Sequence, residues 1–98
     1  MLLRIIKAYR DLVVICDSNL LGKRFSKGKF QLNLKESFYQ GEEVSEEEVI
    51  KILKAMAKED ATFNIVGRQA VETAVKAGVL EESEIRKIKN IPFALILL

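Results

Sequence analysis

The chain has 98 residues, of which 49% are hydrophobic and 31% are charged, and 16 Lys and Arg against 14 Asp and Glu give a net charge of +2. This length is typical of a single domain, here residues 1–98, and the apolar fraction is too high for an intrinsically disordered chain. The longest apolar runs are far shorter than the about 20 residues that a membrane-spanning helix needs. A single cysteine excludes an internal disulfide. We therefore expect a cytoplasmic protein that does not engage a membrane.

The chain lacks histidine, and this absence excludes several chemistries. Ser-His-Asp and Cys-His relays need an imidazole, and a zinc site built from cysteine and histidine cannot form from one cysteine alone. The five glycines are far apart, so the sequence contains neither a G-x-G-x-x-G nor a G-x-x-x-x-G-K-[ST] phosphate loop. We therefore expect no metal, no cofactor and no catalytic residue, which favours a non-enzymatic protein.

Charge is distributed unevenly along the sequence. Residues 1–35 carry eight basic and two acidic side chains, whereas residues 36–60 carry three basic and eight acidic ones. The nearly neutral total therefore conceals a basic first third beside an acidic segment. Lysine and glutamate supply most of the charge, and tryptophan and histidine are missing, a bias typical of proteins from hyperthermophiles. We expect a thermophilic source.

The first third of the chain predicts β-strands. Residues 2–9 are apolar and rich in strand-forming side chains, and the uninterrupted apolar run 12–16 is typical of a central strand buried on both faces. A short strand around Phe25 and a loop at 26–29 lead to a third run, 29–35. In that run apolar and polar residues alternate, so we expect its apolar members to face the core: Phe30, Leu32 and Leu34.

The middle of the chain predicts two helices. Ser45 followed by three glutamates has the pattern of a capping box at the start of the first helix. The second helix is expected to begin after Asp60 and to end at Gly78, because apolar residues recur at helical spacing: Phe63, Val66, Gly67, Ala70, Val71, Ala74 and Val75. Since Gly67 lies on this apolar stripe, its missing side chain is expected to admit another backbone.

Residues 85–89 and 93–98, separated by Asn90-Ile91-Pro92, predict two closing strands. The whole pattern predicts an α+β fold with N-terminal β-hairpins, two central helices packed on a mixed sheet, and C-terminal strands.

A cluster of cations marks the predicted hairpin loop and carries the principal candidate site: Lys23, Arg24, Lys27 and Lys29. Cations on a hairpin can follow a phosphate backbone, so these residues are the candidate nucleic-acid contacts. The alternative is a solvated edge strand on which lysine prevents aggregation. Phe25 and Phe30 are interpreted as core residues rather than as stacking platforms.

Cys16 and Asp17 end the buried run and are interpreted structurally. A reactive thiol needs an electropositive, partly exposed position, whereas Cys16 follows a strand interior and precedes an acid. We expect Cys16 in the core and Asp17 as a cap of the turn that follows it.

Several segments in the same order resemble an archaeal family known as domain of unknown function 424. They are Cys16-Asp17 with Leu20-Leu21-Gly22-Lys23, then Phe38-Tyr39-Gln40-Gly41-Glu42, Asn64-Ile65-Val66-Gly67 and Ile91-Pro92. The resemblance spans nearly the whole chain and implies an archaeal, cytoplasmic α+β protein, with no catalytic residue to carry over. In the family a polar residue such as histidine often follows the proline, where this chain has Phe93.

Three functional hypotheses follow. The leading one is a non-enzymatic accessory module of translation or information processing that contacts RNA or a ribonucleoprotein through the basic hairpin. The rival is a protein-interaction or homodimeric module, in which the apolar residues 93–98 form an edge strand and pair with a partner. The third is a small-ligand or enzyme site near Asn64 and Gly67.

Overall fold

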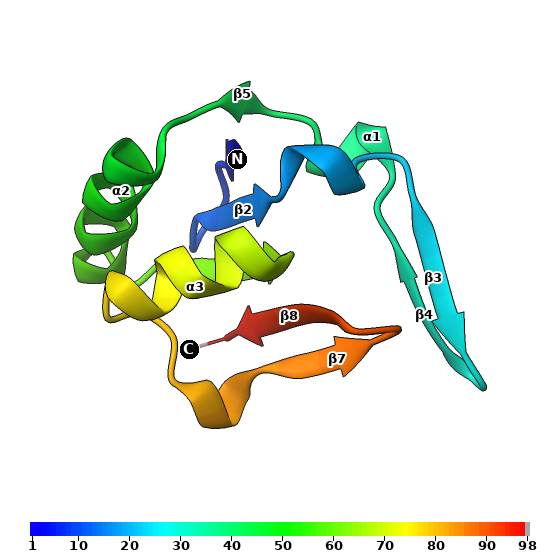
Figure 1. Ribbon diagram of the computed structural model, residues 1–98. Helices are drawn as coiled ribbons and strands as arrows, with labels where there is room; N and C mark the ends of the chain where they lie inside the picture. Colours follow the sequence, from blue (N-terminus) through cyan, green and yellow to red (C-terminus); the bar gives the residue numbers. More distant parts are fainter. Residues whose placement is uncertain (98) are drawn as a thin grey trace.

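The computed structural model describes residues 1–97. Its helices and strands follow one another in this order: β1 Leu2–Ile6, β2 Leu12–Cys16, η1 Ser18–Leu20, β3 Arg24–Lys27, β4 Phe30–Asn33, α1 Glu36–Tyr39, β5 Glu42–Glu43, α2 Glu46–Lys58, β6 Thr62–Val66, α3 Arg68–Lys76, η2 Glu82–Glu84, β7 Arg86–Ile88 and β8 Ile91–Ile96. Figure 1 labels most of these elements. Among residues 1–97, none of the helices has both the length and the apolar composition needed to cross a membrane.

A mixed six-stranded sheet organises the fold, with the strand order β5-β1-β2-β6-β8-β7. β2 and β6 are parallel, and the other neighbours are antiparallel. β3 and β4 form a separate two-stranded hairpin, which stands beside the larger sheet in Figure 1. The predicted α+β class, with hairpins first and two helices packed on a mixed sheet, is confirmed.

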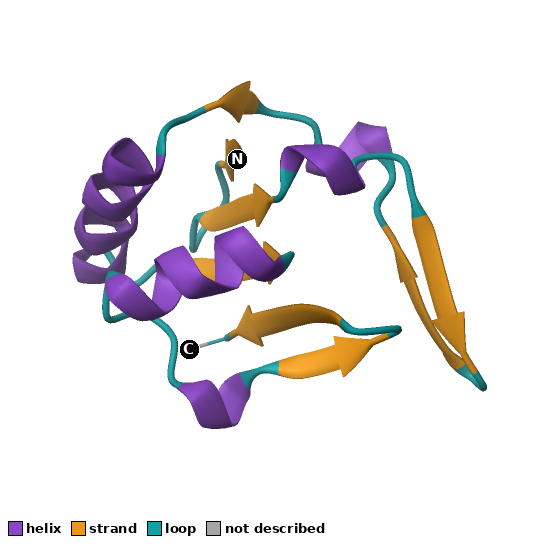
Figure 2. Cartoon of the chain, in the orientation of Figure 1, coloured by secondary structure: helices purple, strands orange, loops and turns teal. Residues whose placement is uncertain are grey.

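Helices α2 and α3 cover one face of the sheet, as Figure 2 shows for the chain coloured by secondary structure. Ser45 caps α2, because its Oγ accepts a hydrogen bond from the Glu48 amide at 3.3 Å, as expected for the serine of a capping box. The apolar stripe of α2 then buries Val49 and Leu53 against Val13 and Ile15 of the central strand. This cluster is the main hydrophobic core.

The opposite face of the sheet is covered only in part, by η1, α1 and the base of the β3–β4 hairpin. Cys16 and Val66 of the sheet pack there beneath Leu32, Leu34 and other residues of these elements. Cys16 is fully buried, as predicted for a structural cysteine. Burial and the neighbouring Asp17 raise the pKa of its thiol to about 12, so the side chain is an inert core residue.

The predicted start of the second helix is wrong. The segment expected to open the second helix is instead the central strand β6, Thr62–Val66, and α3 begins only at Arg68. The apolar residues of β6 continue the helical spacing of those in α3, because one face of the strand and one face of the helix pack into the same core. Gly67 bends the chain between the two elements with a φ of 109°.

The C-terminal strand is also placed differently from the prediction. β8 includes Ile91 and Pro92, and it lies between β6 and β7 rather than at the edge of the sheet. The reversal before it occurs at Lys89 and Asn90, which both adopt positive φ. The premise that residues 93–98 form an exposed edge strand is therefore corrected for the described residues, while Leu98 lies outside them.

Candidate nucleic-acid interface

The predicted basic hairpin exists and projects its cations into solvent. β3 and β4 pair from Arg24 opposite Asn33 to Lys27 opposite Phe30, and Gly28, with a φ of 61°, turns the chain between them. All four predicted contact residues are exposed: Lys23, Arg24, Lys27 and Lys29. Across residues 1–97, none of these four side chains takes part in an ion pair. Their charge is therefore available to an anionic partner.

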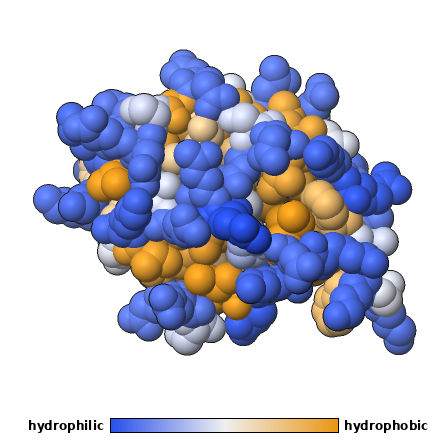
Figure 3. Space-filling view, in the orientation of Figure 1, coloured by the Kyte–Doolittle hydropathy of each residue, from blue (hydrophilic) through white to orange (hydrophobic). Residues whose placement is uncertain are grey.

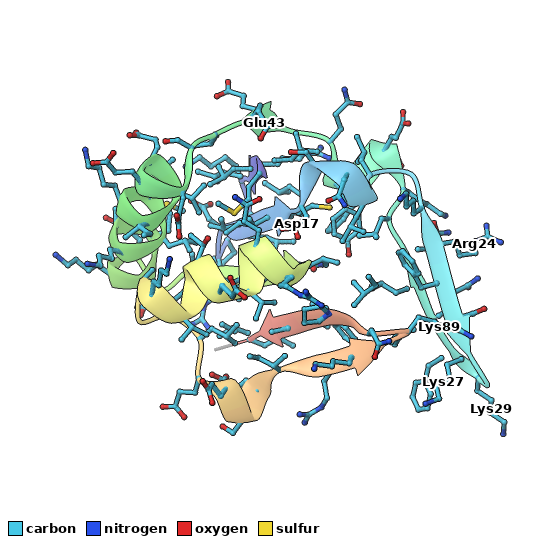
Figure 4. The ribbon with its side chains drawn as sticks, in the orientation of Figure 1. Asp17, Arg24, Lys27, Lys29, Glu43 and Lys89 are labelled. Carbon is cyan, nitrogen blue, oxygen red and sulfur yellow. The ribbon has the colours of Figure 1, made fainter. Side chains whose placement is uncertain are left out.

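The two faces of the hairpin have different neighbours. Phe25 and Leu32 are opposite each other and pack against the core, so they hold the base of the hairpin to the sheet. Lys27 and Phe30 are two residues further towards the turn, on the same face, because side chains alternate along a strand. Figure 4 shows Arg24 on the outer side of the hairpin and Lys27 on the side that faces the sheet.

A second group of cations lies beside the hairpin, and the sequence analysis did not identify it. Arg86 and Lys87 belong to the edge strand β7, and Lys89 occupies the turn that follows. β7 contacts both β3 and β4, so these cations, about 60 residues later in the chain, come close to the hairpin. Figure 4 shows Lys89 on the side of the β7–β8 turn nearest the hairpin. The presence of three cations within residues 85–89 was the available sequence signal.

A pocket of about 350 Å³ lies between the hairpin and β7. Two phenylalanines, an isoleucine and three basic residues line it, and none of its lining residues within 1–97 is acidic: Phe30, Ile88, Phe93, Lys27, Arg86 and Lys87. Lys27 and Arg86 supply its charge, because Lys87 alternates with Arg86 along β7 and also lines the pockets beside α3. Phe30 is 73% exposed, so its prediction as a core residue is wrong. The physical reason is that the hairpin extends beyond the sheet, leaving its outer end without a covering layer.

The guanidinium of Arg86 is partly oriented by the chain itself. Its Nη1 donates a hydrogen bond of 3.3 Å to the carbonyl oxygen of Ser83. This bond uses one of the five N–H groups of the guanidinium. A planar guanidinium beside aromatic rings can bind phosphate oxygens and stack on a flat ligand. The pocket thus combines cations, which can bind the phosphate of a nucleotide, with an exposed ring, on which its base can stack.

Asn64 and Gly67, the third candidate position, are engaged in structural contacts. The Asn64 side-chain oxygen accepts a hydrogen bond of 3.4 Å from the Tyr39 hydroxyl. Gly67 adjoins the side chain of Asp17, not another backbone as expected. Asp17 caps α3 rather than the turn after β2, since its carboxylate accepts hydrogen bonds from the Gln69 and Ala70 amides. Within residues 1–97, no group of three or more acidic, cysteine or histidine side chains could hold a metal ion.

A small apolar area is exposed at the end of β8 and directly after it. Leu95 and Leu97 are 59% and 76% exposed, and their i, i+2 spacing places them on the sheet face that the hairpin covers only in part. Hydrophilic residues dominate the face seen in Figure 3, with hydrophobic ones visible between them. The exposed leucines distinguish β8 from the buried central strands.

Fold and site together define a small α+β protein with a cationic hairpin and an aromatic pocket at its side. Residues 7–98 match the model of the family described as "Protein of unknown function (DUF424)", and the chain belongs to this family. The resemblance seen in the sequence is confirmed. A crystal structure of an uncharacterized conserved protein from Methanopyrus kandleri is similar, with a TM-score of 0.87 and 25% identity over 97% of this chain and 88% of that one. A search of curated proteins found no match.

Proposed function

We propose that this protein is a non-enzymatic RNA-binding module, associated with a ribonucleoprotein of archaeal translation or information processing. The observation that carries the proposal is the meeting of two cationic segments, the β3–β4 hairpin and β7, around one aromatic pocket. Cations beside exposed aromatic rings are the usual chemistry of a surface that binds phosphates and bases together.

The charge of this surface supports an anionic partner in particular. Lys23, Arg24, Lys27 and Lys29 are exposed, and no salt bridge engages them within the described part of the chain. A lysine that only protects a hairpin from edge pairing does not need a second cationic strand beside it. Two adjoining cationic segments concentrate positive potential on one side of the molecule, which attracts a polyanion over a distance of about 10 Å at moderate salt.

The test measures RNA binding at increasing salt for the wild type and for two charge-reversal variants. One variant replaces Lys23, Arg24, Lys27 and Lys29 by glutamate, and its matched control reverses four exposed lysines elsewhere: Lys7, Lys51, Lys54 and Lys58. We expect wild-type affinity to fall steeply with salt and the hairpin variant to lose binding. The control should keep more of its affinity, because its four lysines lie outside the proposed surface formed by the hairpin and β7. Absence of wild-type binding at low salt would reject the proposal.

Exposed leucines on β8 favour a second candidate function, a protein-contact module that uses a sheet face. Leu95 lies on the interior strand β8 and Leu97 follows its last residue, yet both side chains are exposed, and a partner that covered them would bury this apolar surface. Light scattering of the wild type and of a Leu95→Gln/Leu97→Gln variant tests the homodimeric form. A dimer that becomes a monomer in the variant supports this function, and a wild-type monomer at all concentrations excludes self-association.

A further inference from the structure

We infer that the pocket between the hairpin and β7 receives an unpaired nucleobase, so that the ligand is single-stranded RNA or a loop rather than a duplex. This inference rests on the proposed function and makes its ligand more specific. It depends on the environment of Phe30, on the cations around that ring and on the geometry of an A-form duplex.

The exposed ring of Phe30 is the first step in the argument. A phenylalanine at the outer end of a hairpin, 73% exposed, has its apolar surface in water although the same face of the hairpin buries Leu32 two residues away. Phe93 and Ile88 supply further apolar surface in the same pocket. A flat, apolar ligand would cover this surface, and stacking on aromatic side chains is how proteins hold unstacked bases.

The charges around the ring make a nucleotide a better occupant than an uncharged aromatic molecule. Lys27 is directly opposite Phe30 on the neighbouring strand, and Arg86 lines the pocket from β7 on the same sheet face as Phe93. A base stacked on Phe30 would therefore have cations on both sides for the phosphates that flank it. Among the residues that the structure describes, none that lines the pocket is acidic, so none competes for these cations or repels the phosphates.

A duplex cannot satisfy both contacts. In a paired A-form helix the bases are stacked on one another, and the deep, narrow major groove does not admit protein side chains. A duplex could engage the lysines through its phosphates but would leave Phe30 in water. Only a strand with an accessible base can bury the ring and pair with the cations at the same time.

The experiment compares three ligands of equal length by fluorescence anisotropy at one salt concentration. They are an unstructured single-stranded RNA 12-mer, the same phosphate backbone carrying abasic residues, and a blunt RNA duplex. Because the first two share their phosphate number, any difference between them reports the bases. We expect the single strand to bind at least about fivefold more tightly than the abasic strand, which corresponds to the lower end of the stabilisation from one stacked base.

Two variants assign the difference to the pocket. Phe30→Ala should lower affinity for the single strand at least about fivefold and leave the abasic strand unaffected, whereas Phe30→Tyr should retain both affinities because tyrosine also stacks. Tyr9→Ala is the matched control, since Tyr9 is a fully exposed aromatic residue that lines a different pocket, with Arg10, Asp11, Glu59 and Asp60. It should bind as the wild type does.

The outcomes separate this inference from the proposed function. If the wild type binds single, abasic and double strands equally and Phe30→Ala changes nothing, then the pocket does not hold a base, although the protein still binds RNA through its phosphates. If the wild type binds none of the three ligands at low salt, both the proposed function and the inference are wrong. A preference for the duplex would overturn the inference alone.

Discussion

The carboxylate of Asp17 fills the space that a side chain at Gly67 would occupy. A Cβ placed on Gly67 would lie 2.3 Å from Cγ of Asp17, well inside van der Waals contact. From this position Asp17 accepts hydrogen bonds of 3.0 Å from the Gln69 amide and 2.7 Å from the Ala70 amide. The pair joins the end of β2 to the start of α3, because the missing side chain of one residue allows the other to cap the helix.

Replacing Gly67 by alanine should strongly destabilise the fold. The new methyl group would clash with Asp17, and alanine would have to adopt the φ of 109° of Gly67, a conformation that residues with a side chain rarely adopt. We expect the free energy of unfolding to fall by at least about 2 kcal/mol, measured by urea denaturation. Gly78→Ala is the control, since Gly78 has a φ of 78° but no atom of residues 1–97 lies within 4 Å of its Cβ position. About 1 kcal/mol of backbone strain is expected there. Equal losses in both variants would contradict the role of Asp17.

Removing the Asp17 side chain should cost stability in a different way. Asp17→Gly leaves two amides at the start of α3 without their cap, and we expect a loss of about 1–3 kcal/mol. The same change opens space beside Gly67. The double variant Asp17→Gly/Gly67→Ala should therefore lose less stability than the two single losses added together, by about 1 kcal/mol or more. Strict additivity in this double-mutant cycle would show that the two positions are independent.

Alkaline pH should destabilise the protein through Cys16. Burial raises the pKa of the thiol from 9.0 to about 12, so only the unfolded chain ionises it between these values. The stabilisation of the folded state is thus complete below pH 9 and is lost as pH rises towards about 12. The free energy of unfolding, measured from pH 8 to 11, should decline less steeply in Cys16→Ala, because the thiol no longer contributes to the decline. Some decline should remain in this variant, because burial also raises the pKa of Tyr39. Identical slopes would contradict this explanation.

The turn after β7 should become more stable when Lys89 is replaced by asparagine. Lys89 has a φ of 52°, a left-handed conformation that asparagine adopts more readily than lysine. We expect Lys89→Asn to raise the free energy of unfolding by a few tenths to about 1 kcal/mol. Lys87→Asn changes the same charge in the adjacent strand, where asparagine is unfavourable, and should lower stability slightly. A thermal melt in which Lys89→Asn is no more stable than the wild type would refute the prediction.

Local chemistry in the sequence was sufficient for several of these features. The apolar run 12–16 predicted a buried central strand, and Ser45 predicted the start of α2, because each depends on residues next to one another in the chain. The basic loop around Gly28 was found as a hairpin for the same reason. The order of short segments along the chain also indicated the family.

Tertiary structure decided what depends on contacts between distant segments. Residues 62–66 fit a helix or a strand equally well in isolation, and pairing with both β2 and β8 made them a strand. Asp17 became the cap of a helix some 50 residues later, which no local pattern encodes. Phe30 is exposed only because the hairpin projects beyond the sheet, and Arg86 reaches its pocket only because β7 forms the edge beside that hairpin. The strand order, set by burial of the whole sheet rather than by any one segment, therefore assembled the candidate site.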